Sequence, residues 1–191
     1  MRLFTAIELE EAVRLQVAAL ATELQRRVQT SAPRARLTWV AADRLHLTLR
    51  FIGEVERDLA ERIIHVLREP LGEPEFDLTL DALGAFPRKG PPRVLWVGVA
   101  DGRDIVIRAE AAISARLSTL GIRAEDRPYS PHLTLARVRD PAGLRASALF
   151  EGMTVRTGRT RVETITLFQS HLSPKGPTYT VLEKIRLQRT T

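Results

Sequence analysis

The chain has 191 residues, of which 44% are hydrophobic and 27% are charged. These proportions are typical of a globular protein, and the length is sufficient to bury a sizeable core. It contains no cysteine, which excludes disulfide bonds, thiolate nucleophiles and thiolate metal sites. The formal net charge of +6 favours a polyanionic partner such as RNA without identifying one.

In the first part of the chain, residues 2–9 are predicted to form a strand. A helix is predicted over 10–29, because its apolar residues recur at helical spacing with charged residues on the other side. Short strands are expected at 37–40 and at 45–52, separated by a turn. The segment therefore begins as strand, helix, strand and strand.

The middle of the chain repeats this kind of alternation. An amphipathic helix is predicted over 58–67, followed by strands at 76–83 and 94–99. The loop between these two strands contains the basic residues Arg88, Lys89 and Arg93. Its positive charge either steers RNA phosphates or belongs to a solvated loop without a function, and the sequence does not decide between the two.

The rest of the chain is predicted to contain a helix over 104–120, a strand over 132–138 and a short helical segment over 141–149. Three further strands are then expected, at 153–156, 162–170 and 179–187. The whole pattern favours an α+β fold made of two related lobes. We expect residues 1–191 to form a single two-lobed domain.

No basic leader with a long apolar run precedes the first predicted strand, and the longest apolar run, 94–100, is too short to span a membrane. We therefore expect a cytoplasmic protein that does not engage a membrane. Asparagine is absent and arginine greatly outnumbers lysine. These biases fit either a thermophilic source or a GC-rich genome, and the sequence does not separate the two.

One tetrapeptide occurs twice, once in each half of the chain: His46-Leu47-Thr48-Leu49 and His132-Leu133-Thr134-Leu135. Side chains alternate between the two faces of a strand, so each histidine shares a face with its threonine while the leucines take the other face. Each copy is therefore predicted to be a strand with one polar, chemical face and one buried face.

Two histidines with a hydroxyl beside each are suited to phosphate-ester chemistry. A neutral imidazole can take a proton from water and a charged imidazole can give one to the leaving oxygen, because the ordinary pKa of histidine lies near ~6.5. Each threonine hydroxyl can donate to a non-bridging phosphate oxygen. This chemistry requires no metal. The remaining histidines, His65 and His171, are expected to be incidental.

With these motifs, the chain resembles the two-histidine phosphoesterases that carry paired H-x-T-x motifs, and most closely the RNA 2′,3′-cyclic phosphodiesterases, also called 2′-5′ RNA ligases. The resemblance extends over nearly the whole chain. It rests on four segments: Arg2-Leu3-Phe4-Thr5-Ala6-Ile7, the first motif extended to Arg50-Phe51-Ile52-Gly53, the second motif with Ser130-Pro131 before it and Ala136-Arg137 after it, and the tail from Ser170 to Tyr179.

The resemblance implies a bilobal fold of antiparallel sheets with helices outside and a central cleft. It implies hydrolysis of RNA 2′,3′-cyclic phosphate ends, tRNA fragments among the candidates, to 2′-phosphomonoesters, together with a reversible 2′-5′ ligation. Carried over from the family, His46 is the proton donor and His132 the proton acceptor. The protein is expected to act as a monomer without metal or cofactor. Physical reasoning alone requires only that the two imidazoles lie on opposite sides of phosphorus.

Four further residues are candidates for substrate binding: Arg137, Arg50, Tyr129 and Phe4. Arg137 matches a family arginine that would contact phosphate, but strict alternation places it on the leucine face, so that a strand end or bulge must redirect it. Arg50 alternates onto the face of His46. Phe4, Phe51 and Tyr129 are candidates for stacking on a nucleobase, although core packing is the expected role for both phenylalanines and Tyr129 is the most open to a contact with substrate.

Three other functions remain open at this point. A non-catalytic RNA-binding module would use the same residues to bind an end that it never opens. A metal hydrolase would use the histidines as ligands, although no H-x-x-x-H or carboxylate cluster accompanies either motif. A phosphoesterase of the same chemistry could act on a small cyclic nucleotide or on an ADP-ribose cyclic phosphate.

Overall fold

The computed structural model describes residues 1–174 and 176–189. Within this part of the chain, two four-stranded antiparallel sheets form the framework, in the orders β10-β9-β1-β3 and β2-β7-β6-β5. The first sheet contains β1 (Arg2–Glu8), β3 (His46–Glu54), β9 (Thr164–His171) and β10 (Thr178–Arg186). The second contains β2 (Arg36–Trp39), β5 (Leu80–Phe86), β6 (Val94–Val99) and β7 (His132–Asp140).

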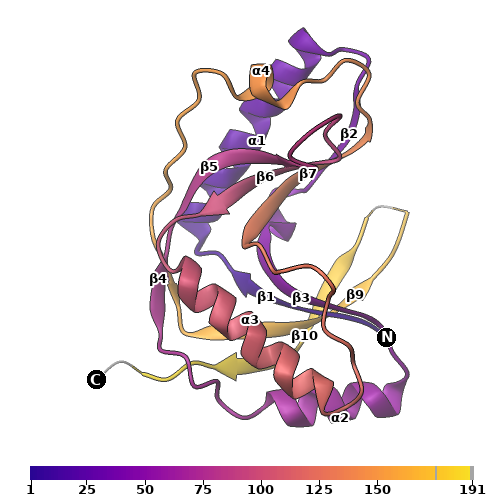
Figure 1. The fold of residues 1–191 in the computed structure, drawn as a ribbon, viewed down its shortest axis with the longest axis vertical. Helices are drawn as coiled ribbons and strands as arrows, with labels where there is room; N and C mark the ends of the chain where they lie inside the picture. The colour runs from indigo at the N-terminus through magenta and orange to yellow at the C-terminus, as the bar shows by residue number, and fades with distance from the viewer. Residues whose placement is uncertain (175, 190–191) are drawn as a thin grey trace.

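Two short strands and the helices complete the fold. The strands β4 (Phe76–Leu78) and β8 (Thr160–Val162) pair as a separate ribbon. The helices are α1 (Glu11–Ser31), α2 (Arg57–Leu67), α3 (Arg103–Ser118) and α4 (Ala146–Phe150), with a 3-10 turn η1 (Ala42–Arg44). In Figure 1, α1 and α4 lie beside the second sheet, and α2 and α3 beside the first. The predicted α+β architecture with outer helices is confirmed.

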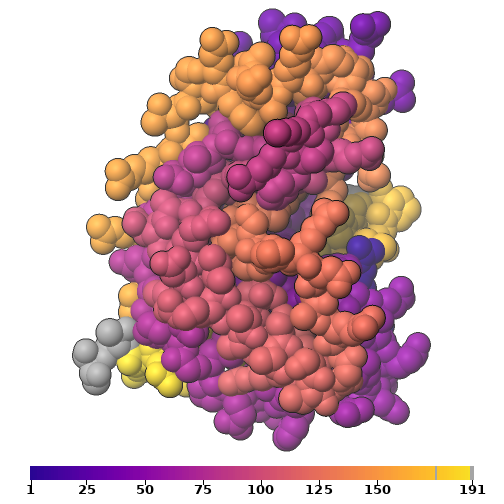
Figure 2. Space-filling model, in the orientation of Figure 1, coloured from indigo at the N-terminus to yellow at the C-terminus, as the bar shows by residue number. Residues whose placement is uncertain are grey.

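The two halves of the chain are interlaced rather than separate. The strand β2, from the first half, pairs with β7, and the late strand β9 pairs with β1. In the space-filling view, early and late segments consequently share the same surface from top to bottom (Figure 2). Each sheet thus contains one histidine motif, in β3 and in β7.

The leucines of the two motifs anchor these strands in the core. Leu47, Leu133 and Leu135 are fully buried, and Leu49 is 4% exposed. Burying a leucine side chain stabilises a fold by roughly 1.5–3 kcal/mol, so a register slip that turned either motif over would forfeit several such contributions. This burial therefore keeps the histidine and threonine side chains on the opposite face.

Both motif strands contain a β-bulge at the same motif position. In β3, Thr48 pairs with Ala6 and Arg50 with Thr5, which leaves Leu49 unpaired. In β7, Thr134 pairs with Trp96 and Ala136 with Leu95, which leaves Leu135 unpaired. An unpaired extra residue reverses the alternation of the side chains that directly follow it. The faces predicted by strict alternation therefore hold only as far as the second leucine of each motif.

Some predicted strands differ in the structure. The strand predicted at 153–156 is wrong: only an isolated bridge joins Arg156 to Asp81. The apolar residues Met153 and Val155 instead pack against the core from a connecting segment, so their alternation reflects packing and not pairing. The strand predicted at 76–83 is divided at Thr79, whose hydroxyl donates to the Asp101 carboxylate at 2.8 Å where the chain passes from one sheet to another.

None of the described helices combines the length and the apolar character needed to cross a bilayer. Helix α1 has the length, with 21 residues, but only one of its faces is buried.

Candidate active site

Both histidine motifs open onto one cleft between the two sheets, a hollow of about 400 Å³. The residues on its wall include His46, Thr48, His132 and Thr134, together with Arg137. The prediction that the two motif strands converge on a shared cleft is therefore confirmed at the level of geometry. A hollow of this size is in the range of small-molecule sites.

The two imidazoles are oriented in the same way. Nδ1 of His46 lies 2.8 Å from the carbonyl oxygen of Arg44, and Nδ1 of His132 lies 2.7 Å from that of Ser130. A carbonyl oxygen only accepts hydrogen bonds, so each Nδ1 carries a hydrogen and donates it. In both rings Nε2 is the nitrogen that remains to exchange protons with a substrate.

Aromatic rings hold His46 in place from the first sheet. The Phe4 ring stacks on it with centroids 5.0 Å apart, and Tyr179 meets it edge-on at 5.3 Å. Phe4 is only 4% exposed, so it is a wall behind the imidazole although it borders the cleft. Its predicted role in stacking on a base is less favoured by this geometry than its role in packing His46.

His132 has a similar enclosure made by the second sheet. The Phe86 ring meets it edge-on with centroids 5.0 Å apart, and Trp96 lies at 6.1 Å. These contacts restrict each ring to one orientation, which a group that transfers protons requires. The sequence did not single out Tyr179, Phe86 and Trp96, because they lie on β10, β5 and β6, and the order of these strands in the two sheets was not predicted.

Burial lowers the pKa of both histidines below the ordinary value, because it disfavours the charged imidazolium. In each ring the backbone carbonyl at Nδ1 opposes this shift and raises the pKa. The nearby charges differ, however. The carboxylate of Glu8 raises the pKa of His46, whereas the guanidinium of Arg137 lowers that of His132.

Arg50 and Arg137 each lie on the face of their strand opposite to the one that strict alternation predicts. The bulge at Leu135 turns Arg137 into the cleft, and the bulge at Leu49 turns Arg50 away from it into the protein, where it is 4% exposed. Placing Arg50 on the cleft face is therefore wrong. Arg137 reaches the cleft through a bulge, which is the redirection that its predicted contact with phosphate required.

Arg50 makes its contacts with the segment between α3 and β7. Its guanidinium donates to the backbone carbonyl of Arg123 and lies 3.5 Å from the carboxylate of Glu125. Tyr129, in the same segment, donates from its hydroxyl to the carbonyl of Thr48 at 2.8 Å. Burial raises the pKa of Tyr129, so it stays protonated. Its side chain thus binds the protein backbone, not an open surface suited to base stacking.

The rim of the cleft contains residues that the sequence analysis placed elsewhere or did not select. Phe51, expected in the core, is 44% exposed and borders the cleft, with the Arg2 guanidinium 5.0 Å from its ring centre. Glu125, Leu172 and Arg2 also border it. The bulge at Leu49 turns Phe51 toward the cleft. The spacing of apolar residues in the sequence does not indicate such a bulge.

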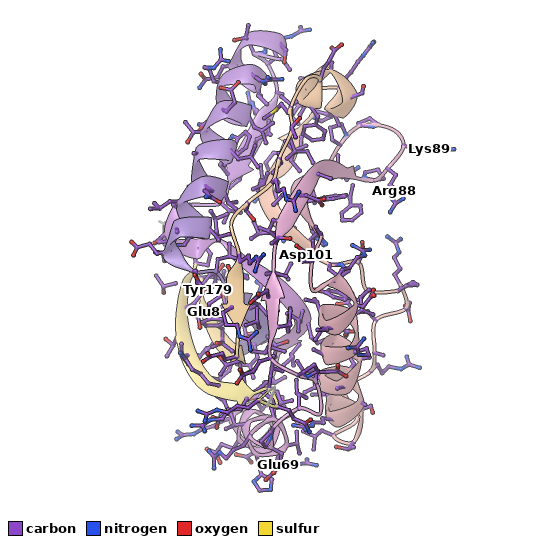
Figure 3. All side chains as sticks on the ribbon, turned by 90° about the vertical axis from the view of Figure 1, so that its left-hand side faces the viewer. Glu8, Glu69, Arg88, Lys89, Asp101 and Tyr179 are labelled. Carbon is purple, nitrogen blue, oxygen red and sulfur yellow. The ribbon has the colours of Figure 1, made fainter. Side chains whose placement is uncertain are left out.

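The remaining candidates lie away from the cleft wall. Arg88 and Lys89 project from the tip of their loop, away from the body of the molecule (Figure 3), and neither borders the cleft. His65 is exposed on α2, and Nε2 of His171 lies 3.3 Å from the Thr180 hydroxyl. Across residues 1–174 and 176–189, no group of three or more histidine or carboxylate side chains is arranged to hold a metal ion.

The chain is similar over nearly its whole length to proteins that are already known. An RNA 2′,3′-cyclic phosphodiesterase of Methanothermobacter thermautotrophicus is 32% identical over 190 residues, covering 98% of this chain and 99% of the relative. The crystal structure of TT0787 of Thermus thermophilus has a TM-score of 0.76 at 32% identity, with 97% of each chain covered. That of Escherichia coli LigT complexed with 3′-AMP has a TM-score of 0.71 at 29% identity, again with 97% of each covered.

A family profile matches this chain in two consecutive stretches, residues 13–96 and 97–179. The boundary between them separates the two motifs, so His46 falls in the first stretch and His132 in the second. This match agrees with the internal duplication, the two motif strands and the cleft that they share. The chain belongs to the LigT-like phosphoesterase family.

Proposed function

We propose that this protein hydrolyses the 2′,3′-cyclic phosphate at the end of an RNA to a 2′-phosphomonoester, with His46 as general acid and His132 as general base. The observation that carries the proposal is the pair of identically tied imidazoles on one cleft, each with a threonine on the same wall. The proposal also rests on relatives named RNA 2′,3′-cyclic phosphodiesterase and on a nucleotide, 3′-AMP, in a related structure.

In this mechanism the attacking and leaving oxygens lie on opposite sides of phosphorus. Nε2 of neutral His132 accepts a proton from water as the water oxygen bonds to phosphorus. The bond from phosphorus to the 3′ oxygen breaks, and that oxygen takes the proton of Nε2 on charged His46. The phosphate remains on the 2′ oxygen, and solvent exchange restores both protonation states.

The other polar groups of the cleft stabilise the charge on phosphorus. The hydroxyls of Thr48 and Thr134 can each donate to a non-bridging oxygen, and the guanidinium of Arg137 supplies a positive charge beside them. Such preorganised donors are most effective when they face charge that develops in the transition state. No step in this mechanism uses a metal ion or a cofactor.

Electrostatics supports the direction of proton transfer. A general acid must be charged before the reaction, and Glu8 favours the charged form of His46. A general base must be neutral, and Arg137 favours the neutral form of His132. The assignment carried over from the family therefore has a physical reason in this chain. In 2′-5′ ligation a 5′ hydroxyl takes the place of water: His132 accepts its proton, the bond from phosphorus to the 3′ oxygen breaks, and His46 protonates that oxygen. The two histidines exchange roles in the reverse reaction, in which the 3′ hydroxyl attacks the 2′-5′ linkage and the 5′ oxygen leaves.

We further propose that the protein acts as a monomer in the cytoplasm and that residues 1–191 form one two-lobed domain. The pairing of β9 with β1 and of β2 with β7 supports one domain, because neither sheet is complete without both halves. A single thermal unfolding transition and a mass of one chain in solution would support this part. Two separate transitions or a stable dimer would contradict it.

The experiment that tests the reaction uses EDTA-treated protein and a short RNA ending in a 2′,3′-cyclic phosphate. We expect a 2′-phosphomonoester product, and its loss in His46→Ala and in His132→Ala. Binding without ring opening in the wild type would favour an RNA-binding module. Activity abolished by EDTA and restored by zinc would favour a metal hydrolase. Faster turnover of a free cyclic nucleotide or an ADP-ribose cyclic phosphate would identify that compound, and not the RNA end, as the preferred substrate.

A further inference from the structure

One acidic side chain borders a cleft whose other charged wall residues are cationic. Among the described residues on its wall, Glu125 is the one carboxylate beside Arg2 and Arg137. Its side chain is 63% exposed, so the carboxylate can still accept hydrogen bonds from a bound molecule. A negative group there opposes the binding of phosphate, and the part of a substrate that suits it is a hydrogen-bond donor.

Glu125 shares the cleft wall with Phe51, and this combination indicates what that partner is. Both side chains border the cleft, and the buried Arg50, which precedes Phe51 on β3, contacts the carboxylate of Glu125. An exposed aromatic ring offers a stacking surface for a nucleobase, which contributes about 1–3 kcal/mol per base. A carboxylate at the edge of such a ring would face the hydrogen-bonding edge of the stacked base.

A carboxylate distinguishes the four bases by their donors, because it only accepts hydrogen bonds. Guanine presents two neighbouring N–H donors on its Watson–Crick edge, N1 and N2. Uracil presents one N–H between two carbonyl oxygens, which the carboxylate repels. Adenine and cytosine each present one amino group next to a ring nitrogen acceptor. The bidentate arrangement is therefore available with guanine and is least favourable with uracil.

Arg50 holds this carboxylate in a defined place. Its guanidinium is almost fully buried, and it joins β3 to the segment at two points, the Arg123 carbonyl and the Glu125 carboxylate. The Tyr129 hydroxyl attaches the same segment to Thr48. Because the segment is tied to the strand that carries His46, Glu125 has a fixed position relative to the reacting phosphate.

We propose that Glu125 is a specificity-determining residue that selects guanine as the base bearing the 2′,3′-cyclic phosphate, and that Arg50 is its positioning residue. This inference rests on the proposed hydrolysis. The base selected is that of the terminal nucleotide, because a hollow of about 400 Å³ accommodates one nucleotide around the two histidines. Phosphate chemistry at His46 and His132 is the same for every base.

The test compares kcat/KM on the four nucleoside 2′,3′-cyclic phosphates, which differ only in the base. We expect the wild type to favour guanine over uracil by roughly tenfold or more, the value of one bidentate base contact. Glu125→Ala brings this ratio close to one. The matched control is Asp126→Asn, the neighbouring acidic residue, which borders a different hollow and should keep the wild-type ratio.

Two variants test the role of Arg50 separately from its contribution to stability. Arg50→Met frees the carboxylate and is expected to lower the guanine-to-uracil ratio mainly through KM for guanine, while Arg50→Lys restores part of the ratio. A purely structural role would lower kcat/KM for both bases equally and leave the ratio unchanged. Combining Arg50→Met with Glu125→Ala should lower the ratio no further than Glu125→Ala alone.

The outcomes separate this inference from the proposed function. Hydrolysis of all four substrates at equal rates, or a guanine preference that persists in Glu125→Ala, overturns base selection and leaves the hydrolase. If none of the four is hydrolysed, the assay on a short RNA decides the proposed function, and titration with 2′-GMP and 2′-UMP decides base selection. Tighter binding of 2′-GMP that is lost in Glu125→Ala supports it, and equal binding overturns it.

Discussion

The hydroxyl of Tyr129 donates a hydrogen bond of 2.8 Å to the backbone carbonyl of Thr48. This contact attaches the segment that leads into the second motif to the strand that carries the first. The two histidines come from different sheets, so their separation depends on links of this kind. A group that must stay within a few tenths of an ångström of its partner benefits from a buried, directional contact.

Replacing Tyr129 by phenylalanine removes this link and keeps the ring. We expect the free energy of unfolding to fall by about 1–3 kcal/mol, because the Thr48 carbonyl loses its buried partner. The value of kcat/KM should also fall, since the two motifs are less firmly placed. Denaturant unfolding and steady-state kinetics measure the two effects. Thr22→Ala, which removes an exposed hydroxyl that donates to the Ala18 carbonyl on α1, is the control for losing a hydroxyl, and equal effects of both variants would contradict a specific role for Tyr129.

The pH dependence of the reaction follows from the two lowered pKa values. Activity requires neutral His132 and charged His46, so kcat/KM should be bell-shaped. Because burial lowers the pKa of both imidazoles in the free enzyme, we expect its maximum below about pH 6.5, the ordinary pKa of histidine. Bound cyclic phosphate favours both charged forms, so the kcat profile should shift to higher pH. A profile flat from pH 5 to 9 would contradict the acid–base pair.

Glu8 gives this prediction a sharper form. Its carboxylate raises the pKa of His46, so Glu8→Gln should lower that pKa further and move the descending, alkaline limb of the kcat/KM profile to lower pH. The ascending limb, which depends on His132, should stay in place. Glu61→Gln on α2 is the control, because Glu61 pairs with Arg57 on the surface. Movement of the ascending limb alone would reverse the assignment of acid and base.

Phe51 provides a separate test of substrate binding. Its ring is 44% exposed at the cleft, so Phe51→Ala should change the free energy of unfolding little. Loss of a base-stacking surface should raise KM by roughly tenfold, since one stacked base contributes about 1–3 kcal/mol. Leu15→Ala, at another exposed apolar residue on α1, is the control for kinetics and stability. An unchanged KM would exclude Phe51 from substrate binding.

Sequence reasoning predicted the parts of this protein that depend on local pattern. The periodicity of α1 places Val13, Val17 and Leu24 in the core, where the structure has them, and the duplicated motif predicts two strands with equivalent faces. The predicted convergence of the motifs on one cleft is confirmed. These successes share a cause, since side-chain period and buried leucines are written directly in the sequence.

The failures depend on pairing between distant strands. Neither bulge is visible in the sequence, because a bulge is defined by its partner strand and the partner was unknown. The faces of Arg50, Phe51 and Arg137 were therefore uncertain beyond the second leucine of each motif. Glu125 was missed for a related reason: it lies in an irregular segment, and its place at the cleft depends on contacts of that segment with β3 that are distant in sequence.

Arg137 gives the most direct test of what the bulge at Leu135 contributes. The guanidinium borders the cleft and lowers the pKa of His132, so Arg137→Ala should act in two ways. Loss of a positive charge facing the phosphate should reduce kcat/KM by about 10²–10³, the size of effect seen when one preorganised donor is removed. The pKa of His132 should rise, which moves the ascending limb of the pH profile to higher pH.

Arg139→Ala is the matched control, because Arg139 lies on the same strand, is exposed and faces Thr38. A loss of activity without movement of that limb would mean that Arg137 binds phosphate without tuning His132, whereas equal losses in both variants would remove Arg137 from the reaction.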